Sequence, residues 1–76
     1  MAADSKPQEV AIRGDYIELA QLLKFSGLVE TGGEAKQVIG AGQVELNGAV
    51  ETQRGKKVVP GDRVRYDGQT LLVRGS

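Results

Sequence analysis

The sequence predicts an α+β fold in which two short helices pack on a small, mostly antiparallel, twisted sheet. Before residue 40, apolar residues recur at helical spacing, whereas from residue 43 onward they alternate with polar residues. Turn-forming dipeptides, of which Asn47-Gly48 is the strongest, divide the alternating part into short strands. The 76 residues suffice for one domain. We expect residues 1–7 to form a disordered tail and residues 8–76 to form that domain.

A short strand and a helix are predicted after the tail. Val10 and Ile12 lie two residues apart, as on one face of a strand. Asp15 and Glu18 have the spacing of a capping box, so the first helix is expected over residues 15–26, with Gly27 ending it. Apolar residues at helical spacing supply its buried face: Ile17, Leu19, Ala20, Leu22 and Leu23.

The second helix is expected over residues 32–41. Thr31 and Glu34 repeat the capping-box spacing, and Gly32 and Gly33 lie between them. The buried face of this helix comprises Ala35, Val38 and Ile39. Because the connection between the two helices is short, their apolar faces are expected to meet in one core.

Five short strands are expected over residues 43–46, 49–52, 57–59, 63–66 and 70–74. Asn47-Gly48 predicts a type I′ turn between the first two, which requires positive φ at both residues. Along residues 63–66, Val64 and Tyr66 are expected to face the core, and the two arginines beside them the outside of the sheet.

The composition argues against an enzyme and against a metal site. The chain has no histidine and no cysteine, which removes the commonest general base and the commonest transition-metal ligands. It has no Ser-His-Asp set and no phosphate-loop lysine motif. No apolar run is long enough for a signal peptide or a membrane span. We expect a non-catalytic cytoplasmic protein without cofactor or metal.

The neutral formal net charge conceals an uneven distribution. Residues 1–53 carry four basic and eight acidic residues, a net charge of −4, whereas residues 54–76 carry six basic and two acidic residues, a net charge of +4. A basic C-terminal third is typical of a surface that meets an anionic partner, although cations on strand faces also serve solubility.

Residues 22–62 resemble the ribosomal-protein S-four type of RNA-binding domain, also called the αL motif. The matching residues occur in the order of the family pattern: Gly27, Thr31, Glu34, Ala35, Ile39, Gly42, Val44, Leu46, Asn47, Gly48, Gly61 and Asp62. Three segments, at residues 22–24, 31–36 and 54–57, resemble the stand-alone bacterial group called YbcJ-like or YaaA-like. The resemblance implies a monomer that binds structured RNA and catalyses no reaction. The expected partners are ribosomal RNA and ribosomal particles.

Two arginines common in the wider family are missing. Where many members carry Arg-Leu-Asp at the first helix, this chain has Glu18-Leu19-Ala20, and where many carry Ser-Arg at the second helix, it has Thr31-Gly32. Contacts to RNA must therefore come from other cations.

The candidate RNA-binding residues cluster around two turns. Glycine amides at the start of a helix can hold a phosphate, although two glycines would also suit a tight turn. Lysine near the positive end of a helix, as at residue 36, opposes its local preference, which hints at function. Solvated lysines and a solvated loop are the alternatives. The candidates are Lys24, Thr31, Gly32, Gly33, Lys36, Arg54, Lys56 and Lys57.

Two other classes of protein remain as alternatives. A sulfur-carrier or ubiquitin-like β-grasp protein would share the size, but such proteins normally end in Gly-Gly, whereas this chain ends Arg74-Gly75-Ser76. A protein–protein adaptor could present the same basic residues to an acidic partner. The chain has two tyrosines and one phenylalanine, too few for a platform that stacks single-stranded bases, and Phe25 and Tyr66 are expected in the core.

Overall fold

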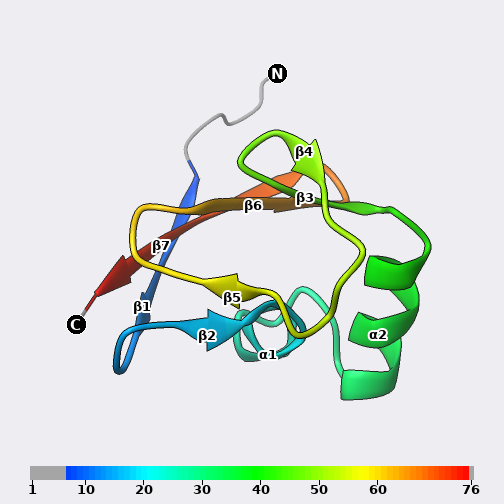
Figure 1. The fold of residues 1–76 in the computed structure, drawn as a ribbon, viewed down its shortest axis with the longest axis horizontal. Helices are drawn as coiled ribbons and strands as arrows, with labels where there is room; N and C mark the ends of the chain where they lie inside the picture. The colour runs from blue at the N-terminus through cyan, green and yellow to red at the C-terminus, as the bar shows by residue number, and fades with distance from the viewer. Residues whose placement is uncertain (1–6, 76) are drawn as a thin grey trace.

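The computed structural model describes residues 7–75 and places two helices against a five-stranded sheet, with a separate two-stranded sheet beside the first helix (Figure 1). All but one residue of the predicted tail, residues 1–7, lies outside the described range. The elements in chain order are β1 (Gln8–Ile12), β2 (Ile17–Glu18), α1 (Leu19–Phe25), α2 (Gly32–Gly40), β3 (Val44–Leu46), β4 (Ala49–Val50), β5 (Lys57–Val58), β6 (Arg63–Tyr66) and β7 (Gln69–Gly75).

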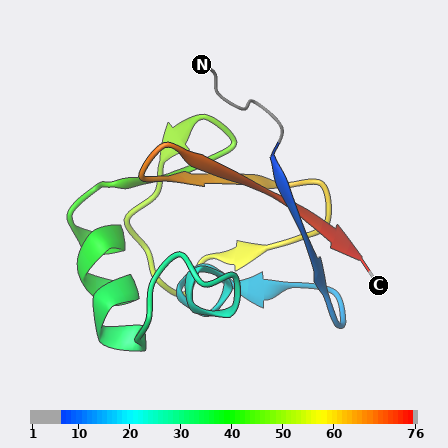
Figure 2. The ribbon, with the colours of Figure 1, turned by 180° about the vertical axis from the view of Figure 1, so that it is seen from behind.

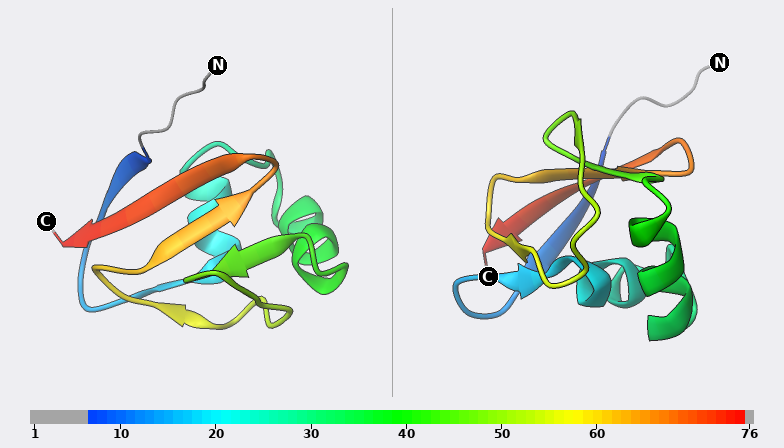
Figure 3. Two further views of the ribbon diagram at one scale, coloured as in Figure 1. Left: turned by 90° about the horizontal axis from the view of Figure 1, so that it is seen from above. Right: turned by 45° about the vertical axis from the view of Figure 1, so that its right-hand side comes forward.

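The large sheet has the strand order β1-β7-β6-β3-β4. Its neighbours pair antiparallel except β1 and β7, which run parallel with Val10 opposite Val73. Figure 3 shows this twisted sheet from above, with both helices on the same side of it. The predicted α+β class with a mostly antiparallel sheet is therefore confirmed.

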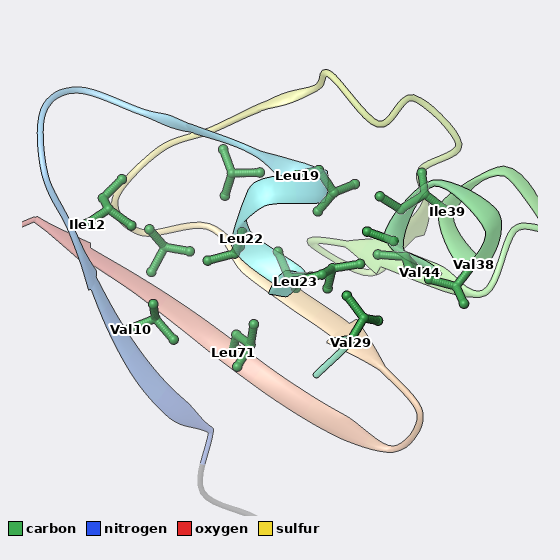
Figure 4. Close-up of a cluster of buried hydrophobic side chains, with 14 residues drawn as sticks. Val10, Ile12, Leu19, Leu22, Leu23, Val29, Val38, Ile39, Val44 and Leu71 are labelled. Atoms are coloured by element: carbon green, nitrogen blue, oxygen red, sulfur yellow. The ribbon is translucent and has the colours of Figure 1, made fainter. Parts of the chain in front are cut away.

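The core lies between this sheet and the helices (Figure 4). Apolar residues at the predicted helical and strand spacing fill it, and Leu19, Leu22 and Ile39 are fully buried. Tyr66 is half-buried against the core, as expected. Phe25, also expected in the core, is 65% exposed, so that prediction is wrong.

The first helix begins four residues later than predicted. Ile17 and Glu18 form β2, which pairs antiparallel with β5. Glu18 occupies the N-cap position of α1 but makes no side-chain cap hydrogen bond, so the predicted Asp15–Glu18 capping box is wrong. The first backbone N–H groups of α1 donate instead to carbonyls of the loop before β5: Leu19 to the oxygen of Lys56 at 2.9 Å, and Ala20 to that of Arg54 at 3.0 Å.

The second helix begins where the sequence predicts. The Glu34 N–H donates to the Thr31 hydroxyl at 3.1 Å, and the Glu34 carboxylate accepts from the Glu30 N–H at 3.1 Å. Gly27, the predicted end of the first helix, has a φ of 83°, which favours glycine.

The hairpin turn is also confirmed. Asn47 and Gly48 have φ values of 53° and 86°, as a type I′ turn requires. Asp67 and Gly68 repeat the pattern between β6 and β7, with φ values of 54° and 76°. β4 is shorter than predicted and β7 is longer. No helix among residues 7–75 has the length and apolar character needed to cross a bilayer.

Candidate nucleic-acid interface

One group of candidate residues surrounds the connection between the two helices. Lys24 lies in the last turn of α1, Thr31 caps α2, and Lys36 follows within α2. Figure 2 shows the short connection between the helices from behind. All five members of this helix-turn group are exposed: Lys24, Thr31, Gly32, Gly33 and Lys36.

The two glycines of the helix-turn group leave the start of α2 open. Gly32 and Gly33 have helical backbones without positive φ, and a Cβ added at Gly32 would meet no atom within 4 Å. The turn therefore does not require glycine at these positions. First-turn N–H groups of a helix have no carbonyl partner within that helix, so these two N–H groups can donate hydrogen bonds to an anion.

A second group lies at the opposite end of α1. Arg54, Lys56 and Lys57, which we call the loop group, precede or begin β5 and are exposed. The carbonyls of Arg54 and Lys56 bind the first turn of α1, which fixes the loop there. The ammonium of Lys57 lies 4.9 Å from the centre of the Tyr16 ring, a cation–π contact.

The helix α1 thus carries a cation group at each end. Lys24 comes five residues after Leu19, a rise of about 7 Å along the helix axis. Lys24 lies in the last turn of α1, and Thr31, Gly32 and Gly33 form the start of α2 after the connection, whereas Arg54 and Lys56 lie at the other end of α1. The single face expected to join all of them stays a prediction.

The arginines of β6 lie apart from both groups. Arg63 and Arg65 are exposed and flank the fully buried Val64, so they point to the outside of the sheet, as predicted. On the same sheet, Arg74 forms an ion pair with Glu9 at 2.6 Å. Among residues 7–75, no cluster of carboxylates could hold a metal ion.

An apolar hollow lies beside α1, between this helix and the segment from β1 to β2. It was not predicted from the sequence. Residues from the end of β1 through β2 to Phe25 line it, among them Arg13, Tyr16 and Gln21. Tyr16 is 46% exposed, and Phe25 is 65% exposed. The helical phase could have revealed Phe25, because residues at 100° per step place it well away from the stripe of Leu19, Leu22 and Leu23.

Comparison with known proteins identifies the class that this fold defines. The family model described as S4 domain matches residues 10–74. The chain belongs to the S4 domain family. The single long helix that a β-grasp carrier would need is absent from the described residues, which hold two short helices.

Two relatives are similar in sequence to this chain over most of its length. The chain is 43% identical over 58 residues to the "Putative RNA-binding protein YbcJ" of Escherichia coli (strain K12), covering 76% of this chain and 83% of that protein. It is 32% identical over 59 residues to the "Probable ribosome maturation protein RlbA" of Bacillus subtilis (strain 168), covering 78% and 83%.

A solved structure shares the fold over nearly the whole chain. The solution structure of YbcJ from E. coli superposes on this chain with a TM-score of 0.71. That structure is described as revealing an αL motif involved in RNA binding. It is 35% identical and covers 97% of this chain and 95% of its own. The chain therefore has the αL architecture.

Proposed function

We propose that this protein is a non-catalytic RNA-binding module that holds structured RNA through contacts to the phosphate backbone. The observation that supports the proposal is the open, exposed start of α2 at Gly32 and Gly33, with Lys24 in the last turn of the helix before it and Lys36 three residues further along α2. Backbone amides at a helix start and flexible ammonium groups are both suited to phosphate oxygens.

The loop group extends the same kind of contact. Arg54, Lys56 and Lys57 provide three cations within four residues, and the backbone of this loop is held by its hydrogen bonds to α1. A fixed loop loses less conformational entropy on binding than a free one. RNA that spans both groups would contact cations at the two ends of α1.

The proposed target is ribosomal RNA, alone or within a ribosomal particle, bound by a monomer in the cytoplasm. Support comes from the relatives, one named for RNA binding and one for ribosome maturation. Residues 8–76 would act as one binding unit.

The test is a titration of the purified protein against labelled ribosomal RNA fragments, followed by fluorescence anisotropy. We expect binding to duplex-containing fragments that weakens steeply with salt. A simple first measurement is the ultraviolet absorbance ratio of the freshly purified protein, because a chain with two tyrosines and no tryptophan reveals even slight amounts of bound RNA. Absence of binding to every fragment at low salt would refute the proposal.

A further inference from the structure

The hollow beside α1 combines exposed aromatic rings with cations, and none of the residues that line it belongs to the phosphate contacts proposed above. Its volume is about 470 Å³, within the range of sites that hold small organic groups. Phe25 is the most exposed large apolar side chain among the described residues, and Tyr16 is also exposed. Exposed aromatic rings at a hollow in a small protein mark a surface that a partner covers.

The groups around the hollow fit a nucleobase with its phosphates. Three cations, Arg13, Lys24 and Lys57, lie in or next to the segments that line it, against two acids, Asp15 and Glu18. The Lys57 ammonium lies 4.9 Å from the centre of the Tyr16 ring, so a cation lies beside one of the aromatic residues that line the hollow. An apolar peptide would gain nothing from these charges, whereas a base carries a phosphate on each side.

Gln21 adds a polar group that can recognise a base edge. It lies one turn before Phe25 on α1, so the two side chains share a face of the helix. Its amide offers both a donor and an acceptor, which is what the edge of a nucleobase requires.

We propose that this hollow binds one unpaired nucleobase of the RNA, stacked on Phe25 and Tyr16, while Arg13 and Lys57 contact the adjoining phosphates. The proposal rests on the proposed RNA-binding function and adds a preference for RNA with a base displaced from its helix. The loop group is hydrogen-bonded to the first turn of α1, and its Lys57 lies against Tyr16 at the hollow, so RNA held by that loop would pass beside the hollow.

The test compares two labelled RNA hairpins with the same stem, one fully paired and one with a single bulged adenosine. We expect the parent protein to bind the bulged hairpin about tenfold more tightly, as stacking on an aromatic side chain provides. Phe25→Ala should abolish this preference and leave the affinity for the paired hairpin unchanged, and Phe25→Tyr should retain it. Val50→Ala, which removes apolar surface from a side chain that is 59% exposed on the distant edge strand β4, is the matched control.

A fluorescent base separates stacking from general contact. With 2-aminopurine as the bulged base, binding of the parent should quench its fluorescence, and binding of Phe25→Ala should not. Equal affinity of the parent for both hairpins, without quenching, would overturn the inference while the RNA-binding function stands. So would equal weakening of both hairpins by Phe25→Ala, or a Phe25-dependent dimer in sedimentation. Failure of the parent to bind either hairpin would overturn both proposals.

Discussion

The side-chain amide of Asn47 donates a hydrogen bond at 3.0 Å to the carboxylate of Asp62, which links the β3–β4 hairpin to the turn before β6. The side-chain oxygen of Asn47 also accepts from the Arg63 N–H at 2.9 Å, and the backbone N–H of Asn47 donates to the Arg63 carbonyl at 2.7 Å. The other oxygen of Asp62 accepts from the Val59 N–H at 3.0 Å. The Asn-Gly and Gly-Asp signatures of the sequence are therefore two halves of one hydrogen-bonded junction.

The junction predicts that Asn47→Ala destabilises the protein more than the equivalent change at the other type I′ turn. Both Asn47 and Asp67 have positive φ, so alanine adds similar backbone strain at either site. Only Asn47 also loses hydrogen bonds to another turn, which should cost about 1 kcal/mol more. Urea unfolding of Asn47→Ala and Asp67→Ala measures the difference. Equal destabilisation would show that the side-chain bonds of Asn47 contribute nothing in solution.

The hairpin turn gives a second prediction. Gly48→Val should lower the free energy of unfolding by about 1–3 kcal/mol, because a β-branched residue cannot adopt a φ of 86° without strain. Gly55→Val is the control, since Gly55 lacks positive φ and a Cβ there meets no atom within 4 Å. The two variants are compared by thermal unfolding, and a Gly48→Val protein that melts with the parent contradicts the turn assignment.

The first helix shows where local sequence patterns stop being sufficient. The start of α2 could be predicted because its capping hydrogen bonds are local. They join Glu30, Thr31 and Glu34, which lie within five residues of one another. The start of α1 could not, because carbonyls more than thirty residues away satisfy its N–H groups. Asp15 and Glu18 matched the capping pattern, but the pairing of β2 with β5 held residues 17–18 extended.

The candidate site was predictable in composition and not in arrangement. Its cations were expected on the surface, and they are exposed. The attachment of the Arg54–Lys56 loop to α1 depends on long-range backbone hydrogen bonds that no local pattern encodes. The hollow does not follow from residue type, because phenylalanine is usually a core residue, whereas the position of Phe25 on the helix turns it outward.

The glycines at the start of α2 give a prediction with opposite signs for stability and binding. Gly32→Ala should leave the free energy of unfolding unchanged or raise it by up to about 1 kcal/mol, because alanine has the higher helix propensity and open space surrounds the site. It should weaken RNA binding, because the new methyl group obstructs approach to the amides. Gly40→Ala, at the last residue of the same helix and equally open, is the control that should gain stability without weaker binding. Unchanged affinity in both variants would remove the amides from the RNA surface.

The salt dependence of binding tests the cations themselves. Contacts to about three to five phosphates release counterions, so the slope of log affinity against log salt should be about −2 to −4. Lys36→Ala, or Lys56→Ala with Lys57→Ala, should weaken binding to many RNAs alike and make the slope shallower by about one for each phosphate that is no longer neutralised. Stability should change by less than about 1 kcal/mol, most of it from the cation–π interaction of Lys57 with Tyr16. Arg65→Ala, on the outer face of the sheet, is the charge-matched control and should leave the slope unchanged. If Arg65→Ala makes the slope shallower and the lysine variants do not, the RNA lies on the outer face of the sheet, and the surface around α1 is only solvated.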